Sequence, residues 1–251
     1  MTPIICGIVN ATPDSFYDGG KYTHLIDHAK RLIDEGANWI DVGGESTRPG
    51  AKLVSTQEEM DRVLPIIEAI APMVHVSIDT TKGLVAIEAH KAGARILNDV
   101  RGFQDPEMQE ASKLYDSAII MHSKGRPQTM QSLTQYDDVV KDVKDWLLEQ
   151  TKHCHAKQLW LDPGIGFAKT QDQNIQLLKA LPQFTSLEQP IVLGTSRKSF
   201  IGHILNRPSP TDRLAGSLAT VADAWYKGVQ AFRVHDVKET KDLLTMLQSI
   251  H

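Results

Sequence analysis

The 251-residue sequence predicts a (β/α)8 barrel, the TIM-barrel architecture of the α/β class, as a single domain over residues 1–251. Two observations predict this fold. Apolar, β-branched runs that end in Gly, Asp or Asn alternate along the chain with amphipathic helical patterns. There are eight such runs, which over about 250 residues match the barrel in both strand count and length. No Pro/Gly/Ser-rich linker divides the chain.

The predicted strands are short, and they comprise residues 4–9, 39–42, 74–78, 95–97, 118–121, 159–161, 191–193 and 231–234. Amphipathic helices are predicted between them, for example over 25–35 and 58–70, where apolar residues recur at helical spacing. Three glycines end helical runs where a left-handed cap is needed: Gly36, Gly93 and Gly228. An open doubly wound sheet is the alternative. It is expected to carry a G-x-G-x-x-G turn after its first strand, and the segment NATPDSFYDGG found there lacks that pattern.

The composition excludes several classes of protein. With 27 Lys+Arg against 31 Asp+Glu the net charge is -4, which argues against a nucleic-acid or anionic-membrane binder. No apolar stretch approaches the ~20 residues of a membrane helix, and the N-terminus lacks the basic region of a secretory signal, so a cytoplasmic protein is expected. Cys6 and Cys154 lie far apart and predict neither a disulfide framework nor a thiolate metal site.

Polar residues gather directly after the predicted strands, at the end of a barrel where active sites lie. Asp79, Asn98 and Asp162 each follow an apolar run. Partly desolvated groups at these positions need partners, and two carboxylates with an amide suit a planar heterocycle that carries an amino group beside a ring N–H. Helix N-capping is the alternative for either aspartate alone.

A second group consists of Asn10, Arg233 and His235. The first and last strands of a closed barrel are neighbours, so these side chains are expected to lie side by side. Together they suit a phosphate group and its divalent cation. Taken singly, Arg233 also fits a solvated surface residue and His235 a satisfied cap.

The segment GTSRKSFIG, residues 194–202, follows the seventh strand and opens a helix. A helix N-terminus at this strand often binds anions, so Lys198 and Ser199 are candidates, with a plain capping sequence equally consistent. Residues 10–20, 43–55 and 122–131 form long irregular segments typical of lids or binding loops, or of ordinary surface loops. His153 and His155 flank Cys154 before a strand, and they predict no metal site.

The motifs together resemble the dihydropteroate synthase family. The resemblance covers essentially the whole chain, through GIVNATPDSFYDGG, IDVGGESTRPGA, SIDTTK, LNDVRG, MHSKGRPQTMQ, LDPGIGFAKT, GTSRKSFIG and RVHDV. It implies a (β/α)8 barrel, commonly a homodimer, that requires Mg2+ and condenses 6-hydroxymethyl-7,8-dihydropterin pyrophosphate with 4-aminobenzoate. The departures are small: Ala11, Tyr17, and Ala168 where the family tends to have Gly.

The resemblance also implies roles for individual residues. The pterin ring is held by Asp79, Asn98, Asp162 and Lys198, in a pocket lined by Met121 and Phe167. The pyrophosphate is bound by Asn10, Thr47, Arg48, Arg233 and His235, with Asn10 also on the metal. The aminobenzoate site, where sulfonamides compete, is formed by Phe16, Pro49, Lys198 and Ser199. The catalytic residues are Asp18, Asp79, Lys198, Arg233 and His235.

The chemistry of the residues agrees with such a reaction. Mg2+ and cationic side chains make pyrophosphate a good leaving group, and no nucleophilic side chain is required. Asp18 and Asp79 are placed to stabilise positive charge on the pterin, while closed loops exclude water. One rival is a pterin-binding methyltransferase of the same barrel type, which needs neither the SRKSF segment nor Arg233 and His235. The other rival is a non-catalytic pterin carrier, which would tolerate loss of Asn10, Asp18 or Arg48.

Overall fold

A computed structural model describes residues 2–11, 23–46, 53–126 and 128–251 of the chain. Eight strands form one parallel sheet: β1 (Ile4–Asn10), β2 (Trp39–Gly43), β3 (His75–Asp79), β4 (Ile96–Asp99), β5 (Ser117–Met121), β6 (Gln158–Asp162), β7 (Val192–Leu193) and β8 (Ala231–Val234). Their order is β6-β5-β4-β3-β2-β1-β8-β7. A bridge between Leu161 and Ile191 joins β6 to β7 and closes the ring. The predicted barrel is confirmed, and so is the contact between its first and last strands.

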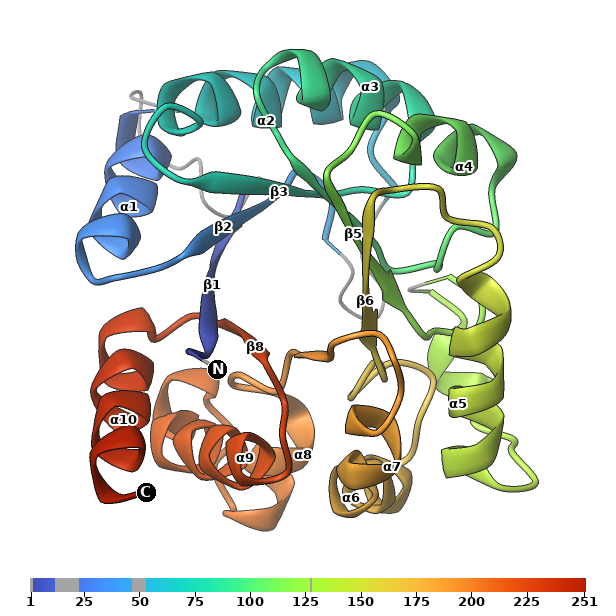
Figure 1. The fold of residues 1–251 in the computed structure, drawn as a ribbon, viewed down its shortest axis with the longest axis vertical. Helices are drawn as coiled ribbons and strands as arrows, with labels where there is room; N and C mark the ends of the chain where they lie inside the picture. The colour runs from blue at the N-terminus through green and yellow to red at the C-terminus, as the bar shows by residue number, and fades with distance from the viewer. Residues whose placement is uncertain (1, 12–22, 47–52, 127) are drawn as a thin grey trace.

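Helices form an outer layer around the strands (Figure 1). The α-helices are α1 (Thr23–Asp34), α2 (Thr56–Ile70), α3 (Gly83–Lys91), α4 (Pro106–Ser112), α5 (Val139–Gln150), α6 (Gln171–Lys179), α7 (Leu181–Thr185), α8 (Ser199–Ile204), α9 (Leu214–Tyr226) and α10 (Val237–Ile250). Short 3-10 turns are η2 (Met130–Ser132) and η3 (Pro210–Arg213). The three cap glycines have positive φ angles of 105°, 115° and 88°, as the sequence predicts for Gly36, Gly93 and Gly228. Among the helices of the described residues, none is long and apolar enough to cross a membrane.

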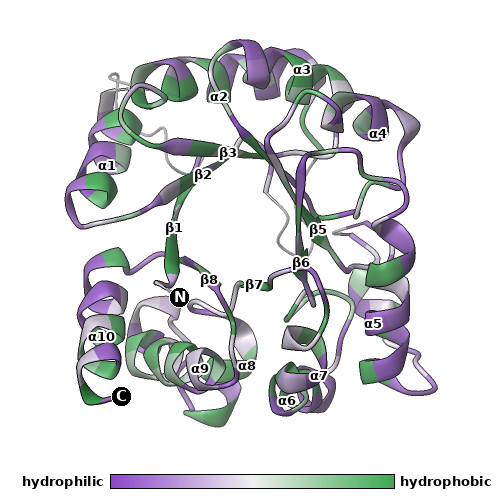
Figure 2. Ribbon diagram, in the orientation of Figure 1, coloured by the Kyte–Doolittle hydropathy of each residue, from purple (hydrophilic) through white to green (hydrophobic). Residues whose placement is uncertain are grey.

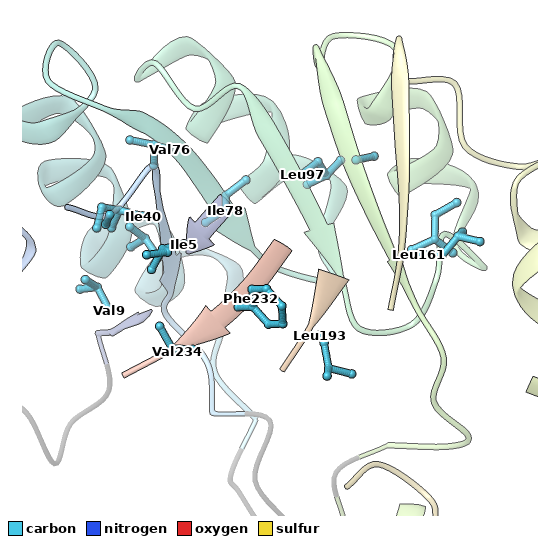
Figure 3. Packing of buried hydrophobic residues seen from close by; sticks show 14 of the residues in the cluster. Ile5, Val9, Ile40, Val76, Ile78, Leu97, Leu161, Leu193, Phe232 and Val234 are labelled. Carbon is cyan, nitrogen blue, oxygen red and sulfur yellow. The ribbon is translucent and has the colours of Figure 1, made fainter. Parts of the chain in front are cut away.

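Side chains alternate between the two faces of each strand. One set faces the helices and forms the main core, which includes Ile5, Ile40, Val76, Leu97 and Phe232 (Figure 3). The strands that carry them and the surrounding helices both contain apolar and polar residues (Figure 2). Burial of the apolar helix faces against the strands therefore stabilises the ring.

The other set faces the inside of the barrel. At the amino-terminal ends of the strands it forms a separate apolar cluster of Cys6, Trp39, Ile96, Ile119, Trp160, Val192 and Ala231. The indole rings of Trp39 and Trp160 pack edge to face with centroids 5.0 Å apart. This plug occupies the barrel interior on the amino-terminal side of the inward polar groups.

Many of the inward positions above the plug are polar. They include Asp41, Ser77, Asp79, Asn98, Asp162 and Arg233, and the first five are buried. A barrel whose inner wall changes from apolar to charged within one strand length needs hydrogen-bond partners, or a ligand, for these groups.

Candidate active site at the carboxyl ends of the strands

A guanidinium between two carboxylates forms the centre of the site. Arg233 on β8 donates from Nε to Oδ2 of Asp41 at 2.6 Å, and from Nη2 to Oδ2 of Asp79 at 3.1 Å. Burial and the charge of Asp41 raise the pKa of Asp79 to about 8, although Arg233 opposes the shift. Burial lowers the pKa of Arg233, but the two aspartates more than offset this effect and raise it overall.

Asp79 therefore does not act as a helix cap. The helix that follows begins at Gly83, with Lys82 at its N-cap position and no capping side chain. The carboxylate of Asp79 points to Arg233 instead, and Asn98 lies beside it, since these two residues are register partners on β3 and β4. The interpretation of this aspartate as a ligand-facing group is thus favoured over the capping alternative.

Asp162 and Lys198 form the opposite side of the site. One oxygen of Asp162, Oδ1, accepts a hydrogen bond from the Gly164 backbone N–H at 2.7 Å. This bond stabilises the turn that follows β6, so Asp162 has a structural role as well. A Cβ added at Gly194 would lie 3.9 Å from the other oxygen, 3.9 Å from Lys198 Nζ and 3.8 Å from Arg233 Cβ. Gly194 thus leaves open the space between these three side chains.

Burial controls the charges of this pair. It raises the pKa of Asp162, partly opposed by Lys198 and the Gly164 N–H, and it lowers the pKa of Lys198 to about 8, partly opposed by Asp162. Lys198 Nζ donates to the carbonyl of Ile165 and lies 4.8 Å from the ring centroid of Phe167. The cation is therefore fixed by the loop that follows β6.

That loop, residues 163–169, is held from below by Lys169. Nζ of this buried lysine donates to the carbonyls of Gly164 and Phe167, both at 2.9 Å, and shares a hydrogen bond of 3.0 Å with Nδ1 of His122. Gly164 has a φ of +68°, and an added Cβ would lie 1.9 Å from the carbonyl oxygen of His122, so only glycine fits. Ala168, where the resemblance leads one to expect Gly, is also left-handed, with a φ of 49°.

The remaining predicted residues lie around the same mouth. Met121 ends β5 as the register partner of Asp162. Asn10 ends β1 opposite Gly43. The ring of His235 shares a hydrogen bond of 3.0 Å with the Ser196 hydroxyl, and Ser199 begins α8 with Lys198 at its N-cap position.

A cavity of about 290 Å³ opens beside the ends of β2 to β6. Its lining includes Asp79, Val100, Arg101, Phe167 and the segment around Arg126. The predicted third loop thus contributes to the cavity wall. Its Lys124 lies 3.5 Å from the ring centroid of Tyr136 and donates to the Gln135 carbonyl at 2.7 Å, so this residue has a structural role.

Part of the prediction lies outside the described residues: Phe16, Asp18, Thr47, Arg48 and Pro49. Cys6 and Cys154 are buried free thiols. Across the described ranges, no group of three or more His, Cys, Asp or Glu side chains could hold a metal ion, and this includes the segment around His153 and His155.

Two polar residues of the site are absent from the sequence-based prediction. Asp41 lies within an apolar strand, and its position two residues before Gly43 is the signal that it faces inward with the other charged groups. Lys169 follows an irregular loop, where a lysine ordinarily lies in solvent, and no local pattern reveals its burial.

Comparison with known proteins agrees with this geometry. Residues 6–235 match the model of the family described as pterin binding enzyme. The dihydropteroate synthase of Escherichia coli K12 is 45% identical over 98% of this chain and 91% of its own length. The chain belongs to the dihydropteroate synthase family of pterin binding enzymes.

Solved structures of dihydropteroate synthase share the fold. The Xanthomonas albilineans dihydropteroate synthase with 4-aminobenzoic acid superposes with a TM-score of 0.93 at 40% identity, covering 99% of this chain and 93% of that one. The Burkholderia cenocepacia dihydropteroate synthase complexed with 7,8-dihydropteroate gives 0.90 at 39% identity, covering 99% and 91%. Substrate and product of one reaction are thus bound by proteins of this architecture.

Proposed function

We propose that this protein is a dihydropteroate synthase, a transferase of folate biosynthesis. It condenses 6-hydroxymethyl-7,8-dihydropterin pyrophosphate with 4-aminobenzoate to give 7,8-dihydropteroate and pyrophosphate. The observation that carries the proposal is the pair of buried carboxylates, Asp79 and Asp162, at the carboxyl ends of β3 and β6 and above an apolar plug. The aminopyrimidinone edge of a pterin presents the N–H donors that such acceptors need.

The pterin ring is bound by Asp79, Asn98, Asp162 and Lys198, with Met121 and Phe167 as its apolar walls. Burial of these groups supports the assignment, because a ligand that satisfies desolvated carboxylates recovers the free energy spent on their burial. Lys198 is fixed against Phe167 and Ile165, so its ammonium is preorganised for the polar edge of the ring.

The pyrophosphate is bound by Arg233 and His235, together with Asn10, Thr47 and Arg48. A Mg2+ ion fits here through oxygen ligands. Asn10, at the end of β1, would hold the ion through its amide oxygen, and oxygen atoms are the ligands that Mg2+ prefers. When bound, the ion neutralises charge on the leaving group.

In the reaction, the bond between the pterin methylene carbon and the ester oxygen that joins it to the pyrophosphate breaks, and a bond from that carbon to the amine nitrogen of 4-aminobenzoate forms. The amine gives up one proton, for which the departing pyrophosphate offers acceptor oxygens. Asp79 and Asp18 stabilise the positive charge that develops on the pterin. Phe16, Pro49, Lys198 and Ser199 hold the aminobenzoate, and this is where sulfonamides compete. We also infer a homodimer, as the resemblance implies, and a cytoplasmic location.

The experiment that tests the function measures pyrophosphate release in incubations from which the pterin pyrophosphate, 4-aminobenzoate or Mg2+ is omitted in turn. Release is expected only when all three are present. A methyltransferase would instead transfer a methyl group from methyltetrahydrofolate to a corrinoid, and a pterin carrier would bind the pterin without releasing pyrophosphate. Either outcome would overturn the proposal.

Gly194→Ala tests the position of the pterin. The added methyl group makes ordinary contacts of 3.8–3.9 Å with Arg233, Asp162 and Lys198, so the fold is expected to tolerate it. The methyl group would lie between the Asp162 carboxylate and the Lys198 ammonium, where we place the pterin. Its overpacking against the bound ring is expected to cost about 1–3 kcal/mol. Calorimetric titration is expected to show a pterin affinity at least about fivefold lower, with an unchanged melting temperature. An unchanged affinity would place the pterin elsewhere.

A further inference from the structure

Asp41 is a buried carboxylate that no part of the proposed mechanism uses. It lies in the middle of β2, is 0% exposed, and occupies the inward layer between the apolar plug and the mouth of the barrel. Its Oδ1 accepts the Ser77 hydroxyl at 2.5 Å, and both of its oxygens lie 3.5 Å from the Asn98 amide nitrogen. Its strongest partner is Arg233, whose Nε donates at 2.6 Å. Partners on three different strands therefore fix this one carboxylate.

The contacts of Arg233 determine which edge of its guanidinium faces the mouth. Nε is engaged by Asp41 and Nη2 by Asp79, and among the described residues Nη1 makes no hydrogen bond. The group is planar, so two anchors on one edge fix its orientation. The side chain of Arg233 is 23% exposed, so the protein groups around it do not enclose it completely.

The two anchors are not equivalent. Asp79 lies at the strand end and lines the cavity, where the proposed function requires its carboxylate to face the pterin. Asp41 lies one layer deeper and is satisfied by protein groups alone. Without the deeper anchor, the guanidinium has Asp79 as its remaining counter-ion. The guanidinium would then move toward the carboxylate of Asp79 and form a closer ion pair with it. Neither group would then be available to a substrate.

We propose that Asp41 is a positioning residue for the condensation. It holds Arg233 by Nε so that the Nη1 edge faces the pyrophosphate, and it leaves Asp79 available to the pterin. This inference rests on the proposed function, because it assigns pyrophosphate to the open edge of Arg233. Asp41 itself touches neither substrate.

Asp41→Asn tests the proposal. The negative charge of Asp41 could either repel an anion or position Arg233, and these two roles predict opposite changes in the affinity for Mg2+–pyrophosphate. If Asp41 only contributed negative charge, its removal would strengthen anion binding. If it positions Arg233, the affinity for Mg2+–pyrophosphate is expected to fall about tenfold or more, as for loss of a charge-assisted hydrogen bond. Calorimetry with inorganic pyrophosphate and Mg2+ measures this directly, and an unchanged or higher affinity would overturn the proposal.

A double-mutant cycle separates positioning from a general structural effect. In the Arg233→Met background, Asp41→Asn is expected to change pyrophosphate affinity less than about twofold, since its effect passes through the guanidinium. An equal loss in both backgrounds would contradict the proposal. Ser77→Ala is the matched control. It removes the other short hydrogen bond of Asp41 but keeps the ion pair, and its affinity is expected to stay within about threefold of the parent.

A measurement on the unmodified protein covers the case in which Asp41→Asn does not fold. The Arg233 Nε–H resonance, assigned by its loss in Arg233→Lys, is expected to exchange with solvent much more slowly than those of exposed arginines. Exchange at the rate of a surface arginine would overturn the proposal. If the unmodified protein binds pyrophosphate but releases none from the substrates, the proposed function fails while the binding cycle still tests Asp41.

Discussion

Replacing Asp162 with Asn is expected to weaken pterin binding about 10- to 100-fold, because a charge-assisted hydrogen bond contributes roughly 1.5–3 kcal/mol. The structure explains why an isosteric amide cannot substitute. Oδ1 of Asp162 accepts the Gly164 N–H at 2.7 Å, so the amide oxygen of the replacement side chain would keep that bond. Its NH2 group would then face the open space beside Gly194, where it would meet the N–H donors of the pterin and the ammonium of Lys198.

Calorimetric titration with a pterin that lacks pyrophosphate measures this effect. The matched control is Asp105→Asn. Asp105 lines the 290 Å³ cavity beside Asp79 and Phe167, but it caps α4 through the Glu107 N–H, a role that asparagine also fills. The control is expected to bind within about threefold of the parent. Equal affinities for the parent and Asp162→Asn, with the fold intact, would show that this carboxylate does not bind the ring.

Asp79→Asn is expected to lower turnover about 10²- to 10³-fold, as for loss of one preorganised electrostatic contact. The same change is expected to stabilise the ligand-free protein at alkaline pH. Burial and Asp41 raise the pKa of Asp79 to about 8, above its value in the unfolded chain. The folded state therefore binds the extra proton, and the parent loses stability from this group as pH rises from about 4 toward 8.

An uncharged asparagine at position 79 removes the loss of stability that the parent shows as pH rises. The difference in melting temperature between Asp79→Asn and the parent is expected to grow from pH 5 to pH 9, to about 2–4 °C for each ~1 kcal/mol gained. Asp242→Asn, on the exposed face of α10, is the control and is expected to show no such trend. If Asp79→Asn loses stability relative to the parent at pH 9, Asp79 is a net structural anchor of Arg233 and not a group held in readiness for a ligand.

Much of this architecture could be predicted from the sequence, because strands and helices leave local periodic patterns. All eight strands lie where apolar runs indicate, and α2 (Thr56–Ile70) contains the predicted 58–70 segment. Asp79, Asn98 and Asp162 could be found because each lies at or next to the carboxyl end of a strand, where a single rule about parallel barrels applies. Arg233 could be placed beside them because a closed barrel makes its last strand a neighbour of its first.

The rest depends on contacts that no local pattern encodes. The role of Asp41 depends on its ion pair with Arg233, which is 192 residues away in the chain. The structural role of Lys169 is visible only in the folded protein. There the loop after β6 directs the carbonyls of Gly164 and Phe167 at its Nζ atom. Buried charged residues take their roles from tertiary partners, whereas the residues at strand ends take theirs from topology.

The central claim is that the amine nitrogen of 4-aminobenzoate displaces pyrophosphate from a pterin held at the carboxyl ends of the strands. The most direct measurement incubates the protein with Mg2+, the pterin pyrophosphate and 4-aminobenzoate labelled with 15N at its amine, and identifies the products by mass spectrometry and NMR. The expected result is one 7,8-dihydropteroate for each pyrophosphate released, with the 15N bonded to the pterin methylene carbon. Pyrophosphate released with the hydroxymethyl pterin as the only pterin product, or no release at all, would contradict it.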